Sequence, residues 1–242
     1  MPDPVNQTPR AEVDGWWGRL VRRLASPRCL LCREAGQDGH DLCAACTATL
    51  PWLHAACLRC AIPLPATGIV CGACLSRPPP VAETRAAFVY GHPLDRLLPR
   101  LKFHRDLAAG RLLADAMARA FAGLPLPDAI VPIPLHTARL RRRGYDQALE
   151  LAKPLASRLA LPLLADSLRR VRETTPQSRL DARARKRNLR GAFIVSGARP
   201  LPTHVALVDD VMTTGATLHS AARALHRAGV VRVDAWVCAR VP

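Results

Sequence analysis

The sequence predicts an α/β protein in which a largely parallel sheet is covered by helices on both faces and preceded by a small cysteine-rich module. Strand-like and helix-like segments alternate after residue 80, which is typical of a parallel sheet. Eight of the nine cysteines form Cys-x-x-Cys pairs before that point. We expect a tail with a short helix over 1–25, the cysteine module and a linker over 26–80, and the α/β domain over 81–242.

The composition is that of a folded protein with an anionic partner. Of the 242 residues 49% are apolar and 22% are charged, which excludes a disordered chain. Basic residues outnumber acidic ones by 35 to 19, and residues 139–190 hold 15 basic against 5 acidic side chains. This excess favours phosphates, nucleic acid or a membrane surface as partner. There is neither a transmembrane-length apolar run nor a signal pattern at the N-terminus, so we expect a soluble, cytoplasmic protein.

A short amphipathic segment precedes the cysteines. Trp17, Leu20, Val21 and Leu24 would share one face of a helix, with arginines on the other sides. We expect this helix to pack on the protein, and a membrane-surface helix is the alternative.

The cysteine pairs predict two structural zinc sites. The pairs recur every 14 residues, and they are Cys29/Cys32, Cys43/Cys46, Cys57/Cys60 and Cys71/Cys74. Two such pairs complete one tetrahedral zinc site, whereas a reducing cytosol disfavours disulfides and a redox motif needs only one pair. Equal spacing permits sequential sites (29/32/43/46 and 57/60/71/74) or interleaved ones (29/32/57/60 and 43/46/71/74). Shorter loops close at lower entropy cost, which favours the sequential arrangement.

The elements of the α/β domain follow in order after a proline-rich linker over 76–80. A strand is expected over Ala86–Tyr90, and Asp106 is expected to cap a helix that runs through Ala122. Ala129–Val131 predicts a strand and Tyr145–Leu161 an amphipathic helix. The remaining expected elements are a fully buried strand at Val205–Val208, a helix at Thr217–Ala228 stopped by Gly229, and a half-buried strand at Val231–Val241 in which Cys238 is a small buried apolar residue.

The segment that follows Val205–Val208 predicts a phosphate-binding turn. Asp209 and Asp210 end the strand, and a loop rich in threonine and glycine leads into a helix. In open α/β sheets ligands bind beyond the carboxyl ends of the strands, and amides at a helix N-terminus hold phosphate. The acids can bind sugar hydroxyls or a Mg²⁺-linked diol. The candidate phosphate-binding residues are Thr213, Thr214, Gly215, Ala216 and Thr217. Neither a P-loop nor a dinucleotide-binding motif occurs.

The string from Val208 to Thr217, Val-Asp-Asp-Val-Met-Thr-Thr-Gly-Ala-Thr, resembles the phosphoribosyl pyrophosphate (PRPP) motif of type I phosphoribosyltransferases. Together with the four cysteine pairs it resembles the ComF family, from about residue 20 to the end. Further matching pieces are Leu101-Lys102-Phe103, Pro132-Ile-Pro-Leu, Arg143-Gly-Tyr-Asp-Gln-Ala148, and Arg172–Gln177 leading to Arg187–Phe193. The resemblance implies a phosphoribosyltransferase-like domain with an N-terminal double zinc ribbon, a ribose on Asp209 and Asp210, and a link to internalising single-stranded DNA.

The resemblance also implies roles for the basic segments. The loop from Pro132 to Arg143 would approach pyrophosphate, with Arg139, Arg142 and Arg143 as ligands, and Lys102 is a further candidate. Residues 172–190 would form a basic loop that closes over PRPP.

Two functions remain open from the sequence. The first is a phosphoribosyltransferase that binds Mg²⁺–PRPP and works by positioning and charge stabilisation, since no nucleophile–base pair stands out. The second is a DNA-processing or uptake adaptor that binds single-stranded DNA, acts with a DNA-uptake helicase or processing protein, and keeps a vestigial or regulatory PRPP pocket. A PRPP-responsive transcription regulator is a weaker third hypothesis.

Overall fold

The computed structural model describes residues 27–37, 40–103, 106–172, 191–196 and 200–242. The helix expected around Trp17–Leu24 and nearly all of the predicted 172–190 loop lie outside these residues. The chain divides into two compact units, one of residues 1–49 and one of residues 50–242. Among the described residues, the helices are all too short or too polar to cross a membrane.

The first unit is organised around Cys29, Cys32, Cys43 and Cys46. A tight turn brings the Cys29 N–H to the carbonyl of Glu34 at 2.8 Å. The helix α2 (Ala44–Ala48) begins directly after Cys43, whose sulfur accepts a hydrogen bond from the Cys46 amide.

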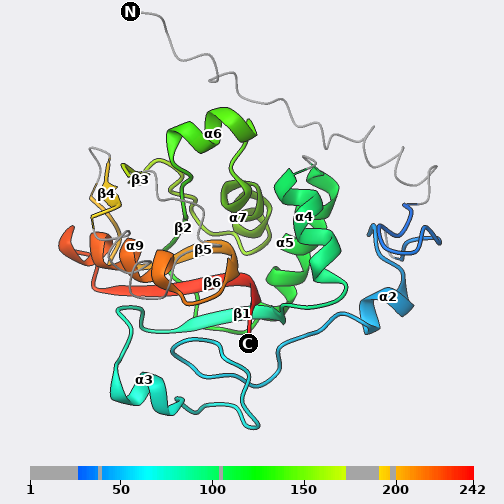
Figure 1. The fold of residues 1–242 in the computed structure, drawn as a ribbon, viewed down its shortest axis with the longest axis horizontal. Coiled ribbons are helices and arrows are strands. Elements are labelled where there is room, and N and C mark those ends of the chain that lie inside the picture. Colours follow the sequence, from blue (N-terminus) through cyan, green and yellow to red (C-terminus); the bar gives the residue numbers. More distant parts are fainter. Residues whose placement is uncertain (1–26, 38–39, 104–105, 173–190, 197–199) are drawn as a thin grey trace, which may run out of the picture. The chain divides into compact units, whose positions relative to one another are not determined.

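Four parallel strands form the main sheet of the second unit in the order β1-β6-β5-β2 (Figure 1). Their bounds are β1 (Thr84–Val89), β2 (Ala129–Pro132), β5 (His204–Met212) and β6 (Arg232–Arg240). The register sets Asp209 beside Val237 and Met212 beside Arg240. Because all four strands are parallel, their carboxyl ends meet at one edge, where the candidate site lies.

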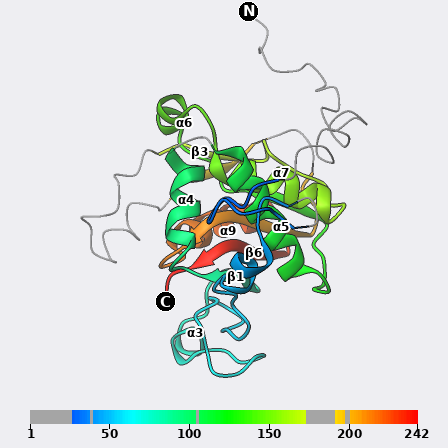
Figure 2. The ribbon, with the colours of Figure 1, turned by 90° about the vertical axis from the view of Figure 1, so that its right-hand side faces the viewer.

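Helices cover both faces of this sheet, as the sequence predicts. The helices α5 and α7 pack against each other and against β1, β2 and β5, whereas α9 packs against β5 and β6 from the other side (Figures 1 and 2). The helix bounds are α3 (Gly72–Ser76), α4 (Leu94–Phe103), α5 (Leu107–Phe121), α6 (Thr137–Arg143), α7 (Gln147–Arg158) and α9 (Ala216–Arg227). Asp106 caps α5 by accepting a hydrogen bond from the Ala109 amide at 3.0 Å.

The prediction of a half-buried last strand is wrong. Val231 lies just before β6 and is exposed, but β6 is buried along nearly its whole length because it lies between β1 and β5 and the helices α5 and α9 cover its two faces. Even Asp234 and Arg240, at polar positions of the alternating pattern, are 4% and 9% exposed. Cys238 is fully buried, as predicted, and burial raises the pKa of its thiol.

Sequence reasoning missed α4, α6 and the antiparallel pair of β3 (Leu168–Arg170) and β4 (Phe193–Val195). Pro99 lies inside α4, where a proline is expected to break a helix. One face of that helix is nevertheless buried through Leu94, Leu97, Leu98 and Leu101. Tertiary packing therefore overrides the local signal there.

Residues 50–62 run along the free edge of β1. The Leu53 amide donates to Ala87 O and the Val89 amide donates to Pro51 O, both at 2.9 Å. The Trp52 ring lies 4.6 Å from the Phe88 ring, centroid to centroid. This cover satisfies backbone groups that an edge strand would otherwise expose.

Candidate functional site

The eight paired cysteines form two clusters of four. Within each cluster all sulfur atoms lie within 4.8 Å of one another, and the members are Cys29, Cys32, Cys43 and Cys46 in the first cluster and Cys57, Cys60, Cys71 and Cys74 in the second. This confirms the sequential pairing and excludes the interleaved one. Four convergent thiolates are the ligand set of a structural zinc site. The chain therefore carries two candidate Zn²⁺ sites, one in each unit.

In each cluster, backbone amides hydrogen-bond to one buried cysteine sulfur and lower the pKa of its thiol. The amides of Arg59 and Cys71 donate to the Cys57 sulfur at 3.4 and 3.3 Å. Burial opposes ionisation of Cys57, but these amides outweigh it and lower the pKa of the thiol to about 7. Cys29 is buried in the same way, and nearby amides lower the pKa of its thiol to about 6. One thiolate per cluster is thus favoured without metal, whereas burial and the neighbouring thiols raise the pKa values of Cys46 and Cys74.

Near the carboxyl end of β5, the acidic residues Asp209 and Asp210 lie beside the lysine side chain of α4. The Lys102 ammonium, from the last turn of α4, lies 2.9 Å from Asp210 Oδ2. The other Asp210 oxygen accepts the Val211 amide at 2.7 Å, and Asp209 Oδ1 accepts the Asp210 amide at 2.9 Å. The sequence placed Lys102 and the two aspartates in one site, and the structure brings them together.

Burial and neighbouring charges shift the pKa values of both Asp209 and Lys102. Burial and the neighbouring Asp210 raise the pKa of Asp209 well above the usual range of a carboxyl group. Burial also opposes the charge of Lys102, but the attraction of Asp210 outweighs it and raises the pKa of the ammonium. Lys102 therefore keeps its positive charge beside Asp210, and Asp209 is a carboxyl group whose ionisation a further cation would favour.

The turn after β5 exposes a set of donors at the start of α9. Thr213 and Thr214 are exposed and Thr217 is partly exposed, whereas Gly215 is buried. Gly215 has φ of 72° and forms the N-cap of α9, so the 12-residue helix begins at Ala216. A Cβ at position 215 would lie 2.5 Å from the Met212 methyl group and 2.9 Å from the His219 ring. Glycine is therefore required both by the backbone conformation and by the packing beneath it.

The three predicted arginines lie on α6, and they differ in their contacts. Arg142 is exposed, whereas Arg139 and Arg143 are partly buried. Arg143 donates to the Gln147 side chain at 2.5 Å and its guanidinium lies 5.6 Å from the centroid of the Phe103 ring. Arg143 thus contacts both α7, through Gln147, and α4, through Phe103, the residue after Lys102.

Two residues that sequence reasoning did not assign also belong to the site. Asp146 caps α7 and accepts the Leu135 amide at 2.7 Å, which fixes the loop after β2. Burial raises the pKa of its carboxyl, and the charge of Asp210 adds to this. Arg170, on β3, is largely buried, and burial together with Arg139 lowers the pKa of its guanidinium while Asp209 opposes the change. Arg170 has no local sequence signal because it lies among many surface arginines.

Two known domain families match this chain. Residues 20–75 match the family described as "Double zinc ribbon domain", and residues 145–242 match "Phosphoribosyl transferase domain". These matches agree with the two cysteine clusters and with the parallel sheet.

Named relatives match the chain over most of its length. The chain is 39% identical to "DNA utilization protein YhgH" of Salmonella typhi over 222 residues, which is 88% of this chain and 96% of that protein. It is 34% identical to "Competence protein F" of Haemophilus influenzae over 224 residues, with the same two coverages. It is 29% identical to "Competence protein ComFC" of Bacillus subtilis over 150 residues, or 61% of this chain and 59% of that protein.

We expect the purified protein to hold two zinc ions per chain, because each four-cysteine cluster provides one complete ligand set. Cys29→Ser should remove one ion and leave the melting of the α/β unit unchanged, since that cluster lies in the other unit. Cys57→Ser should remove one ion and lower that melting temperature by roughly 5 °C or more. Elemental analysis and calorimetry measure both effects. Equal melting of the two variants would contradict the assignment of the second cluster to the α/β unit.

Lys102→Met should destabilise the α/β unit by about 2–4 kcal/mol, because it leaves the buried Asp210 carboxylate without its cation. Adding Asp210→Asn should restore most of this free energy, since the neutral amide needs no cation. Urea unfolding of the two single variants and the double variant measures the coupling. Strictly additive losses would show that the 2.9 Å contact contributes nothing to stability.

Proposed function

Since the chain belongs to the ComF family, we propose that its phosphoribosyltransferase-like domain binds Mg²⁺–PRPP at the carboxyl end of β5. The proposal covers a phosphoribosyltransferase linked to DNA uptake or nucleotide metabolism in the cytoplasm. Membership supports the domain type and the link to DNA utilisation. The ligand and its cation are inferred from the residues of the site.

One observation carries the proposal: a buried strand presents two adjacent carboxyl groups immediately before a glycine-capped helix N-terminus. Asp209 and Asp210 would bind the ribose hydroxyls of PRPP, and the amides and hydroxyls of 213–217 would bind its 5′-phosphate. The dipole of the 12-residue α9 and the amides of its first turn favour an anion there. The distance of this loop from the acids is fixed because Val211 and Met212 still belong to β5.

The remaining charges suit the pyrophosphate and its cation. The carboxylate oxygens of Asp209 and Asp210 are hard ligands that fit Mg²⁺ or the diol bound to it. When bound, Mg²⁺ would neutralise charge on the leaving pyrophosphate. Arg139, Arg142 and Arg143 would bind its oxygens, and Lys102 would hold Asp210 in place. These groups would position the ligand and stabilise charge as the bond from the anomeric carbon to pyrophosphate breaks.

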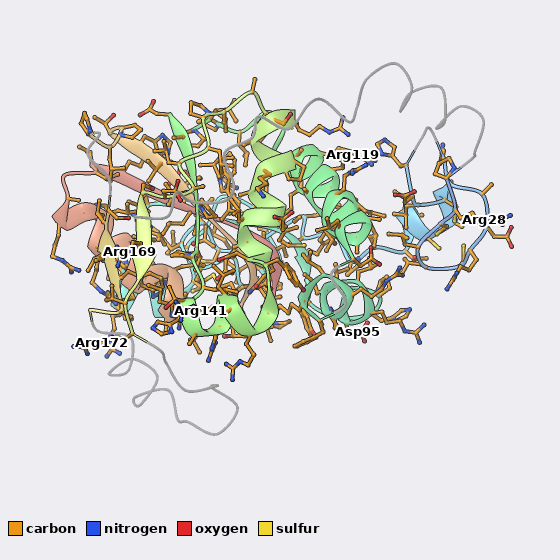
Figure 3. All side chains as sticks on the ribbon, turned by 90° about the horizontal axis from the view of Figure 1, so that it is seen from above. Arg28, Asp95, Arg119, Arg141, Arg169 and Arg172 are labelled. Atoms are coloured by element: carbon orange, nitrogen blue, oxygen red, sulfur yellow. The ribbon has the colours of Figure 1, made fainter. Side chains whose placement is uncertain are left out.

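A specific observation favours the second candidate, an adaptor that binds single-stranded DNA. Arg141 on α6, Arg169 on β3, and Arg172 are exposed, and Figure 3 labels all three on the domain. Exposed arginines of this kind can neutralise nucleic-acid phosphates. Under this alternative a DNA-uptake helicase or processing protein is the expected partner, and the PRPP pocket is regulatory or vestigial.

Asp209→Ala and Asp210→Ala should each weaken binding of Mg²⁺–PRPP by about 1–3 kcal/mol, because each removes charge-assisted hydrogen bonds to an ordered ligand. Titration calorimetry measures the affinity. Asp166→Ala, which removes an exposed carboxyl group distant in sequence from β5, is the matched control and should bind like the native chain. An unchanged affinity in the Asp209/Asp210 double variant would refute the pocket.

The double variant Arg141/Arg169→Ala separates the two candidate functions. It should leave the PRPP affinity within about twofold, because both side chains are exposed and neither is among the residues proposed to bind PRPP. If DNA binds through them, the salt slope of the affinity for a labelled oligodeoxynucleotide should fall by about 1.4, which is about 0.7 for each of the two lost phosphate contacts. Tight DNA binding by a native chain that does not bind PRPP would make the adaptor the better account.

A further inference from the structure

The second cysteine cluster is bonded to the main sheet through three successive carbonyl groups. Leu58 O accepts the Thr84 amide, Arg59 O accepts the Thr84 hydroxyl, and Cys60 O accepts Arg240 Nε, each at 2.8 Å. The Arg59 amide of the same turn donates to the Cys57 sulfur at 3.4 Å. A metal ion held by Cys57 and Cys60 would therefore fix the backbone whose carbonyl groups the sheet binds.

Arg240 connects this turn to the end of β5. It is the last residue of β6 and is 9% exposed, so its guanidinium is held inside the protein. Its Nη1 donates to Met212 O at 3.3 Å and also to Val241 O. The Val241 amide donates to the same Met212 oxygen at 3.0 Å. Met212 is the last residue of β5 and immediately precedes the 213–217 loop.

Met212 in turn supports the loop from below. Its side chain is 2% exposed, and its methyl group occupies the space where a Cβ of residue 215 would lie. Ala61, the residue after Cys60, is fully buried in the same apolar cluster as Met212. The cysteine turn and the loop thus share both a hydrogen-bonded connection and a packed core, although Cys60 and Arg240 are 180 residues apart in sequence.

We propose that Arg240 is a positioning residue that transmits the metal state of the second cysteine cluster to the 213–217 loop. With Zn²⁺ bound, the Cys57–Cys60 turn holds Cys60 O in place, Arg240 holds Met212 O, and Met212 holds Gly215 in the conformation that starts α9. Without the ion the turn relaxes and the loop loses order. The consequence for ligand affinity rests on the proposed PRPP function; the ordering of the loop does not.

If Arg240 only stabilised the fold, the two sites would not be linked. Replacing Arg240 would then lower the stability of the whole unit without changing how zinc and PRPP affect each other. Coupling between two sites is reciprocal, so if zinc in the second cluster favours PRPP binding, PRPP must raise the zinc affinity of that cluster. This reciprocity is the readout that a general loss of stability does not produce.

The test compares Arg240→Met with Arg59→Met. Arg59 lies in the same turn and donates to Val81 O at 3.2 Å, away from β5, so its variant removes a similar bond without touching Met212. Amide hydrogen exchange of residues 213–217, measured without PRPP, should accelerate about fivefold or more in Arg240→Met and stay unchanged in Arg59→Met. If Arg240→Met does not fold, Arg240→Lys gives the same comparison, because a single ammonium nitrogen does not reproduce the separate Nε and Nη1 donors that bind Cys60 O and Met212 O.

The second readout is the zinc affinity measured by equilibrium competition with a chromogenic chelator in the Cys29→Ser background, in which only the second cluster holds an ion. Mg²⁺–PRPP should raise this affinity about fivefold or more, and Arg240→Met should abolish the increase. Unchanged exchange of 213–217 in Arg240→Met, or exchange that accelerates uniformly across the unit, would overturn the proposal. A native chain that does not bind PRPP would refute the proposed function alone, since the exchange comparison, repeated with and without zinc, still decides whether Arg240 couples the second cluster to the loop.

Discussion

The burial of β5 and β6 on both faces is the constraint on which the rest of the domain depends. Strands of this kind can carry polar side chains only where a partner is supplied or where the strand ends. Asp210 is 4% exposed and is matched by the Lys102 ammonium at 2.9 Å, while Asp209 lies beside it at the edge. The 213–217 turn proposed to bind phosphate, the N-cap at Gly215 and the start of α9 all follow from the point at which this strand leaves the core.

The second cysteine cluster is part of this domain as well as part of a zinc ribbon. Residues 51–53 cover the edge of β1, and the Cys57–Cys60 turn is hydrogen-bonded to Thr84 and Arg240. The first cluster lies in a separate unit. Two ribbons with the same spacing therefore lie in different units, and the second has a bonded route to the candidate site.

Local signals were sufficient to predict the elements that carry their own pattern. The apolar run before Asp209, the cap at Asp106 and the spacing of the cysteines each identified a structure that is present. The sequence could indicate only that Lys102 and Asp210 belong to one site. Their direct contact depends on how α4 packs against the sheet, which has no sequence signal. The Arg240–Cys60 bond and the full burial of β6 have no sequence signal, because both depend on which strands become neighbours.

A crystal structure of the chain with Mg²⁺–PRPP tests the central claim most directly. The account predicts the 5′-phosphate on the amides of 213–217, the ribose hydroxyls or their Mg²⁺ on Asp209 and Asp210, and Arg240 still bonded to Cys60 O and Met212 O. It also predicts that Lys102 remains within hydrogen-bond distance of Asp210. A ligand bound elsewhere, or none at saturating PRPP with the 213–217 loop ordered and unobstructed, would contradict it.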